Sequence, residues 1–203
     1  MPTRRQMLFV MGNGFVLSGL SGSSASLATE SSSGASFRVV ADADDIELTP
    51  TNDRPVYVQT DADGFVSEFT LGDDGGVNTR AITRFEDIVQ ITNVSTDAVE
   101  GVYFSFDATS DSLSGETLDA IEAAMQATAA DRTLESTGLS GDDLLAVSPN
   151  ATVADGELEP GESVPFGLQV DLAPSSEPGH LEDLPPSDDY ELTLRVHTVW
   201  PDG

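Results

Sequence analysis

The sequence predicts an all-β fold, an antiparallel jelly-roll-like β-sandwich with one inserted α-helix at about residues 115–130. Three observations point to this class. Short segments with an apolar residue at every second position recur, turn-forming segments separate them, and one segment changes to helical spacing. The length of 203 residues is enough for one domain with a buried core. We therefore expect a single sandwich domain at 37–200, with a helical insertion at 111–150.

The strongest strand pattern lies at residues 84–107, where we expect two central strands joined by a polar turn at 93–101. In the second arm the apolar residues alternate without interruption, which is typical of a strand with one buried face. The apolar positions of the two arms are Phe85, Ile88, Val89 and Ile91, then Val102, Phe104 and Phe106.

The remaining strands are predicted from shorter stretches of the same alternation. The first is FRVVA at 37–41, where Phe37, Val39 and Ala41 share one face. The clearest lies within 161–172, where five apolar side chains share one face. The others are expected at 46–48, 56–59, 64–71 and 190–199, separated by segments rich in Gly, Pro, Asp and Ser.

The strand pattern is interrupted at residues 114–132. Leu118, Ile121 and Met125 recur at helical spacing among several alanines, and Ser114 is a good N-cap residue. An amphipathic helix is predicted there, and its apolar stripe is expected to pack on the sheet. Turns and a short apolar segment complete the insertion.

The charge balance of the chain is strongly acidic. Asp and Glu number 36 against 8 basic residues, all of them Arg, so the net charge is −28. Such a surface repels itself at low ionic strength, but at molar salt the Debye length falls to about 3 Å and the repulsion largely disappears. This composition indicates a protein of a strongly saline environment. It argues against binding to nucleic acids or anionic membranes, which requires clustered basic residues.

The N-terminus carries a motif for export. Arg4 and Arg5 precede a modest apolar run, and small residues follow as far as Ala28. This order is typical of a twin-arginine signal peptide. The apolar run of about fourteen residues is shorter than the roughly 20 that a membrane span needs, so we expect no stable membrane anchor. We predict a signal peptide at 1–28, a flexible Ser-rich leader at 29–36, and a mature protein that is extracellular or on the cell surface.

The sequence shows no pattern of a catalytic or metal site. It has no cysteine, which excludes disulfides, thiol catalysis and cysteine-ligated metals. The only histidines, His180 and His197, are predicted to face solvent, and Ser140 lacks the glycine spacing of a nucleophile elbow. Acidic fragments such as residues 61–64 resemble parts of calcium loops but stop before the required ligands. We therefore expect no enzyme activity, no cofactor and no metal.

Two glycosylation sequons fall in predicted turns, at Asn93 and at Asn150. Sequons also arise by chance in segments rich in Ser and Thr. We favour glycan attachment at Asn93, because it is expected in the exposed turn of the central pair of strands.

Three segments together resemble a family of exported haloarchaeal proteins of unknown function. They are FRVVADADDIELTP at 37–50, FEDIVQITNVSTDAVEGVYFSF at 85–106 and LEPGESVPFGLQVDL at 158–172. That family is distantly similar to the TasA and camelysin group of biofilm-fibre subunits and to archaeal bundling-pilus subunits. The resemblance implies a jelly-roll domain whose relatives polymerise by lending an N-terminal strand to the next subunit.

The idea of a donor strand also has physical support in the residues. An extended segment can complete a neighbour's sheet through main-chain hydrogen bonds while its alternate side chains fill pockets. Residues 29–41 combine a leader with the alternating Phe37, Val39 and Ala41 that such a strand needs. The alternative is that 37–41 is simply the first strand of its own sheet.

Three hypotheses about function follow. The preferred one is an exported structural protein of the cell surface or extracellular matrix of a halophile, a fibre or pilus subunit that self-associates by exchange of its N-terminal strand. The alternative is a monomeric secreted binding module for a glycan, a cation or an envelope partner. A secreted hydrolase is disfavoured, because the sequence pattern identifies no nucleophile paired with a base and no set of metal ligands.

Overall fold

The computed structural model describes residues 32–33, 35–42, 45–51, 57–71, 77–147 and 156–201. Several sequence predictions fall elsewhere in the chain. The export motif with Arg4, Arg5 and Ala28 lies outside the described residues, as does the second sequon at Asn150.

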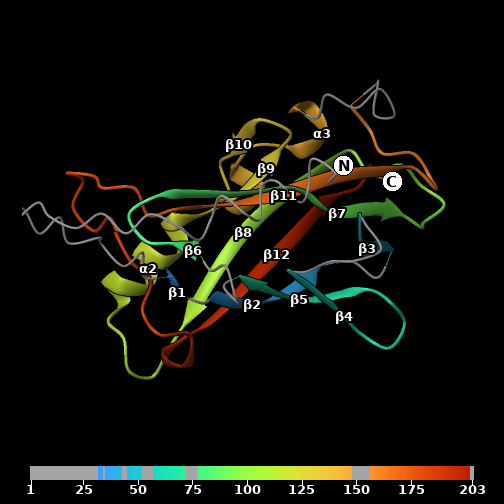
Figure 1. Ribbon diagram of the computed structural model, residues 1–203. Coiled ribbons are helices and arrows are strands. Elements are labelled where there is room, and N and C mark those ends of the chain that lie inside the picture. Colours follow the sequence, from blue (N-terminus) through green and yellow to red (C-terminus); the bar gives the residue numbers. More distant parts are fainter. Residues whose placement is uncertain are drawn as a thin grey trace, which may run out of the picture.

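Two five-stranded sheets pack face to face, which confirms the prediction of an all-β sandwich with a small helix (Figure 1). The β12 sheet has, in order, β4 (Val58–Thr60), β5 (Val66–Leu71), β2 (Ala35–Ala41), β12 (Glu191–Val199) and β8 (Gly101–Thr109). The β7 sheet has β10 (Arg132–Leu134), β9 (Met125–Ala129), β11 (Ser163–Asp171), β7 (Ile82–Asn93) and β3 (Ile46–Pro50). A separate two-stranded sheet pairs β1 (Ser32–Ser33) with β6 (Val77–Asn78).

The core lies between the inner faces of the two sheets. Phe104 of β8 contacts Phe166 of β11 across this layer, with ring centroids 4.8 Å apart and an interplanar angle of 39°. Within the β12 sheet, Phe37 packs on Phe69 with centroids 5.1 Å apart. All four rings are at most 2% exposed. The predicted alternation of the central strands is confirmed, because Val102 is buried on the same face as Phe104.

The centre of the β12 sheet is built on its last strand. β12 pairs antiparallel with β8 from Glu191↔Thr109 to Val199↔Gly101, and Figure 1 shows the two strands side by side through the middle of the molecule. On its other side β12 pairs with β2, and this pair is parallel. Among the described strands the remaining pairings are antiparallel. The strands β2 and β12 come from opposite ends of the chain, so no short hairpin constrains their relative direction.

The inserted helix ends earlier than the sequence predicts. The helix α2 (Gly115–Ala124) begins at the predicted N-cap, where Ser114 Oγ accepts a hydrogen bond from Thr117 N at 3.2 Å. The prediction of helix to about residue 130 is wrong, because Met125–Ala129 is strand β9 and pairs with β11. Alanines at these positions favour a helix when isolated, but pairing with a buried strand overrides that preference. The insertion therefore contributes two strands to the β7 sheet, together with α3 (Leu144–Val147).

The expected leader at 29–36 is partly ordered in strands. Ser32 and Ser33 pair with Asn78 and Val77, and β2 begins at Ala35, two residues before the predicted start. Part of the segment predicted as a flexible leader thus pairs in strands. Main-chain pairing needs no apolar alternation, so a run of serines gives no signal for it.

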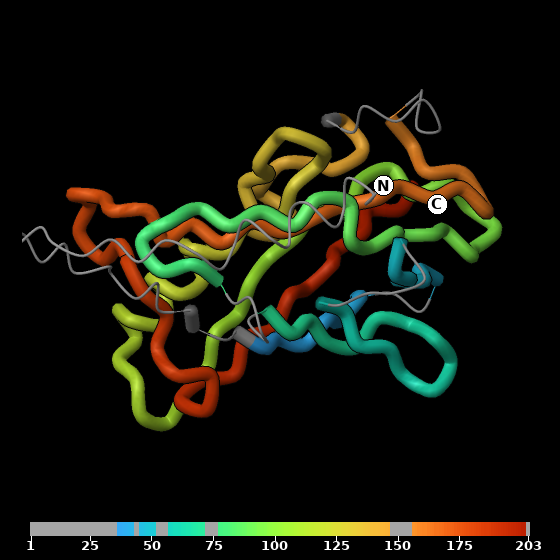
Figure 2. The backbone as a smooth tube through the Cα atoms, viewed as in Figure 1, coloured from blue at the N-terminus to red at the C-terminus, as the bar shows by residue number. Residues whose placement is uncertain are grey.

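Two loops close one end of the sandwich, where Figure 2 shows the chain after β8 beside the turn that precedes β12. Ser110 Oγ donates to Asp189 C=O at 2.5 Å across these loops, next to the short helix η3 (Ser187–Asp189).

No helix in the described part of the chain is long and apolar enough to cross a bilayer.

Tyr190 provides a test of the packing at this end. Its side chain is 6% exposed, its hydroxyl has no hydrogen-bond partner among the described residues, and burial raises its pKa to about 12. An unfolded tyrosine ionises near pH 10, so the folded state holds the proton longer. The free energy of unfolding therefore does not depend on this group below pH 10. It falls by up to about 3 kcal/mol as the pH rises from 10 towards 12, because the tyrosine ionises more readily in the unfolded chain.

We expect Tyr190→Phe to leave the free energy of unfolding at pH 7 unchanged and to reduce its fall between pH 10 and pH 12. Denaturant unfolding at molar salt measures the free energy at each pH. The control variant Tyr103→Phe should show the same fall as the unchanged protein. A loss above about 1 kcal/mol at pH 7 would show that the hydroxyl is hydrogen-bonded.

Candidate functional site

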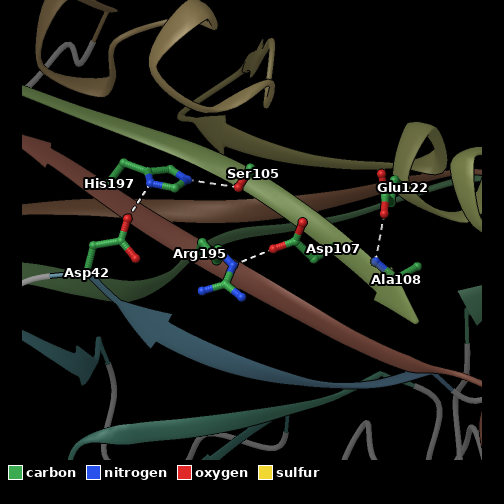
Figure 3. A network of polar contacts seen from close by, with 7 residues as sticks. All are labelled: Asp42, Ser105, Asp107, Ala108, Glu122, Arg195 and His197. Carbon is green, nitrogen blue, oxygen red and sulfur yellow. Dashed lines mark hydrogen bonds and ion pairs between the residues drawn. The ribbon is translucent and has the colours of Figure 1, made fainter. Parts of the chain in front are cut away.

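The outer face of the β12 sheet carries a group of polar side chains contributed by three adjacent strands (Figure 3). Because side chains alternate along a strand, burial of Val196 turns Arg195 and His197 of β12 to the outer face. The same alternation on β8 turns Ser105 and Asp107 outward. Strand pairing thus brings together groups that are far apart in the sequence.

His197 lies at the centre of this group, between Asp42 and Ser105 (Figure 3). Its Nδ1 is hydrogen-bonded to Asp42 Oδ2, and its Nε2 lies 2.8 Å from Ser105 Oγ. The His197 side chain is 20% exposed and that of Asp42 is 42% exposed, so the array sits at the surface with its imidazole largely covered. We call these three residues the Ser–His–Asp row.

The backbone fixes each member of the row. Asp42 directly follows β2, and its N–H donates to Val196 C=O at 3.0 Å. Ser105 lies opposite Arg195 in the β8–β12 ladder. The short helix η1 (Gly138–Ser140) passes beside the imidazole, and Gly138 has a φ of 69°, a conformation that favours glycine.

The chemistry of the row follows from its donors and acceptors. An ionised carboxylate only accepts hydrogen bonds, so the proton on the imidazole is held at Nδ1 beside Asp42. In the neutral imidazole Nε2 then has a lone pair, and it accepts a hydrogen bond from the Ser105 hydroxyl. The order carboxylate, imidazole, hydroxyl is the arrangement by which serine hydrolases make a hydroxyl nucleophilic.

A salt bridge lies next to the row on the same strands. Arg195 Nε contacts Asp107 Oδ2, and both side chains are well exposed. The hydrogen bond to Asp107 and its charge, with a further contribution from Asp42, raise the pKa of Arg195 above its ordinary value. The guanidinium therefore stays charged and offsets part of the negative charge beside His197.

The free edge of β8 is covered by the insertion. Val102 N donates to Asp143 Oδ1 at 2.9 Å, and Ala108 N donates to Glu122 Oε1 at 2.7 Å. Between them, Ser105 forms an isolated bridge with Thr137. These contacts satisfy main-chain groups that an exposed edge would offer to another strand.

A hollow of about 510 Å³ opens beside Ser105, between β8, α2 and the segment after β10. Its lining combines apolar groups with hydroxyl, amide and carboxylate groups. It comprises Ser105, Phe106, Asp119, Glu122, Ala123, Met125, Gln126, Glu135, Ser136 and Thr137. This size is within the range of small-molecule sites.

The predicted donor-strand residues lie together in β2. Phe37 is 2% exposed and contacts Phe69 and Phe106, with ring centroids 5.1 and 6.2 Å apart. Val39 and Ala41 are partly buried against the core. β2 is thus paired within the sheet of its own chain, between β5 and β12.

The predicted exposure of Asn93 is wrong. Its side chain is fully buried at the end of β7, where Nδ2 donates to Asp97 C=O and to Leu158 C=O, both at 2.8 Å. Its Oδ1 accepts from Ser95 N at 2.9 Å and from Ser95 Oγ at 2.7 Å. A glycan on Nδ2 is incompatible with these contacts, so Asn93 organises the turn as an Asx residue.

Sequence reasoning missed the Ser–His–Asp row. Both histidines are only partly exposed, since the His197 side chain is 20% exposed and His180 Nε2 lies 2.5 Å from Ala173 C=O. The contacting members of the row are 92 and 155 residues apart, so no local spacing reveals them. The only signal was the alternation that turned Ser105 and His197 to one face of their strands.

Among the described residues, no group of three or more His, Asp or Glu is arranged to hold a metal ion. In the fragment at 61–64, Asp61 Oδ1 instead accepts from Asp63 N and Phe65 N, both at 3.0 Å. This carboxylate therefore has a structural role in the turn between β4 and β5.

Comparison of the chain with protein-family models, with curated proteins and with solved structures found no match.

We expect Asn93→Ala to lower the free energy of unfolding by about 2 to 3 kcal/mol, because the fully buried Asn93 side chain loses four hydrogen bonds. Asn78→Ala is the matched control, since Asn78 is exposed, and should change stability by less than about 0.5 kcal/mol. Denaturant unfolding at molar salt checks both values. Equal stability of the two variants, or a glycan found by mass spectrometry at Asn93, would contradict the structural role.

Proposed function

We propose that this chain is an exported structural protein of the cell surface or extracellular matrix of a halophile, and that its subunits assemble by exchanging β2. The observation that carries the proposal is the position of this strand. β2 is the first long strand of the sandwich, yet it lies inside the β12 sheet between β5 and β12.

The contacts of β2 suit a strand that is passed between copies. It pairs with β12 from Phe37↔Leu192 to Ala41↔Val196, and with β5 from Ala35↔Leu71 to Arg38↔Glu68. Phe37 anchors it between two buried rings. The same strand from a second copy would make the same hydrogen bonds and fill the same space, so exchange costs little beyond association itself.

The connection after β2 favours this exchange. Only residues 42–45 separate β2 from β3, and β3 belongs to the opposite sheet. Short hinge loops invite domain swapping. Before β2, the described residues form only the short strand β1, which pairs with β6.

The edges of the sheets give association by simple strand addition little to build on. β4 and β10 have three residues each, and β3 ends at Pro50, which has no N–H. The edge strand β8 is covered by the insertion and capped by Asp143 and Glu122. Exchange of an interior strand is therefore the route to assembly that the described strands favour.

Composition supports the remaining parts of the proposal. The chain has 36 acidic and 8 basic residues, and its net charge of −28 disfavours close approach of two copies at low ionic strength. Molar salt reduces the Debye length to about 3 Å and removes this barrier. The pair Arg4 and Arg5 before an apolar run supports export.

Crosslinking between different variants tests the exchange, because the chain has no cysteine of its own. Arg38 of β2 lies opposite Glu68 of β5 in an antiparallel pair, which suits a disulfide. The variants Arg38→Cys and Glu68→Cys are mixed at molar salt and then oxidised. We expect a disulfide-linked dimer of the two variants, because β2 of one copy reaches β5 of another.

The control pair is Asp107→Cys with Thr193→Cys. These residues also face each other across a ladder, but β8 and β12 both stay within one copy during the exchange. We expect at least tenfold less mixed dimer from this pair than from the test pair. Equal yields, or only monomers by negative-stain microscopy at molar salt, would contradict assembly through β2.

A second candidate function is glycan binding by the monomer at Trp200. A hollow of about 550 Å³ is lined by Asp45, Val94, Ser95, Thr96, Asp97, Trp200 and Pro201. An aromatic ring beside carboxylates and hydroxyls offers both a stacking surface and polar contacts. Trp200 is the only tryptophan of the chain, so its fluorescence reports this site directly. Saturable quenching by a glycan, lost in Asp97→Ala and accompanied by a monomeric mass, would favour this function over assembly.

A further inference from the structure

We propose that Ser105 is a nucleophile, activated by His197 and Asp42, that hydrolyses uncharged or cationic carboxylic esters through an acyl-serine. The inference rests on the Ser–His–Asp row (Figure 3) and on the hollow beside Ser105. It does not depend on whether subunits exchange β2.

The two ring nitrogens of His197 connect all three side chains of the row. The Asp42 carboxylate holds the imidazole proton at Nδ1, and Nε2 faces the Ser105 hydroxyl at 2.8 Å. This distance lies within the range of about 2.6–3.2 Å expected between a nucleophile and its general base. Each partner therefore has the role that acyl transfer requires, with Asp42 positioning the base.

Paired strands and a backbone hydrogen bond hold the row in place. Ser105 and His197 lie on neighbouring strands of a nine-residue ladder, and Asp42 is tied to Val196 through its backbone N–H. Catalytic groups on strands are held more accurately than groups on loops. The row is thus preorganised before a substrate binds.

The row lies beside a hollow in the surface. Ser105 lines the hollow of about 510 Å³, whose apolar lining comes from the exposed Ala123 and from the small exposed parts of Phe106 and Met125, which are 5% and 3% exposed. Thr137 and Gln126 line the same hollow, and their side chains carry groups that can donate hydrogen bonds to a polar substrate. The hollow therefore brings apolar and polar groups together beside Ser105.

The charge of the hollow selects the substrate class. Asp119, Glu122 and Glu135 line it, in a chain whose net charge is −28. Carboxylates repel anionic substrates and attract cationic ones. Esters without negative charge are therefore preferred, and the carboxylate product is expelled.

The reaction is balanced with water as the only co-reactant. The Ser105 Oγ–C bond forms as the hydroxyl proton moves to His197 Nε2 and the carbonyl π electrons move onto oxygen. The ester C–O bond then breaks, and Nε2 returns the proton to the leaving alcohol. Water repeats the two steps on the acyl-serine, which releases the carboxylic acid and restores the Ser105 hydroxyl.

Covalent labelling of the whole folded chain at molar salt tests the proposal. An uncharged fluorophosphonate is added, and peptide mass spectrometry locates the modified residue. We expect modification of Ser105, reduced at least tenfold in His197→Gln and in Asp42→Asn. Hydrolysis of p-nitrophenyl acetate should show a burst and fall at least tenfold in Ser105→Ala.

Matched controls separate this site from background reactivity. Ser67→Ala removes an exposed serine of the same sheet whose Oγ donates to Gln59 C=O at 3.4 Å, and His180→Gln removes the second histidine. Both should leave labelling and hydrolysis unchanged. Labelling spread over several serines, or a rate that survives in Ser105→Ala, would overturn the proposal.

A thiol readout covers the case in which the alanine variant fails to fold. Ser105→Cys and Ser67→Cys each carry a single thiol, because the chain has no other cysteine. We expect iodoacetamide to alkylate Cys at position 105 at least tenfold faster at pH 7, because His197 favours the thiolate. The advantage should vanish when His197→Gln is added. Equal rates would show that His197 does not activate this position.

Discussion

The pairing of β12 with β8 on one side and β2 on the other is the interaction on which the rest of the structure depends. The inner face of β12 supplies Leu192, Leu194 and Val196 to the core, where they are at most 1% exposed. Its outer face presents Arg195 and His197. Since the side-chain period of a strand is two, a shift of one residue would exchange these faces and remove both core and site. The same register therefore stabilises the fold and aligns the polar groups above it.

Strand alternation made most of the sandwich predictable from the sequence, and it failed where main-chain pairing acts without an apolar pattern. The rows through Phe104 and Phe166 correctly marked buried faces. Met125–Ala129 has the composition of a helix, but it is a strand that pairs with β11, where Thr128 lies opposite Gly167. A Cβ added at Gly167 would lie 2.2 Å from Phe85 C=O and 2.7 Å from Thr128 Oγ1, so the strands pack closely at this glycine. Asn93 looked like an exposed turn residue, because the sequence does not show that its amide closes the turn onto Leu158.

The candidate site could not be predicted, because it depends on the order of strands. Asp42 and His197 are 155 residues apart and meet only because the first long strand lies beside the last. This arrangement also links the two proposals. If copies exchange β2, Asp42 travels with that strand, and each row would combine a serine and a histidine of one subunit with an aspartate of the next. The order of the sheet would then make the chemistry of one subunit sensitive to its neighbour.

The parallel alignment of β2 and β12 also determines how the domain bears mechanical force. The chain enters β2 at Ala35, at one end of the ladder, and leaves β12 at Val199, at the opposite end. Tension between these points pulls the two strands past each other along their axes. Their hydrogen bonds are then loaded together in shear, whereas a hairpin pulled at its open end breaks its bonds one at a time. Forced unfolding is governed by the unfolding rate, and with this geometry the hydrogen bonds between β2 and β12 must break together before the two strands separate.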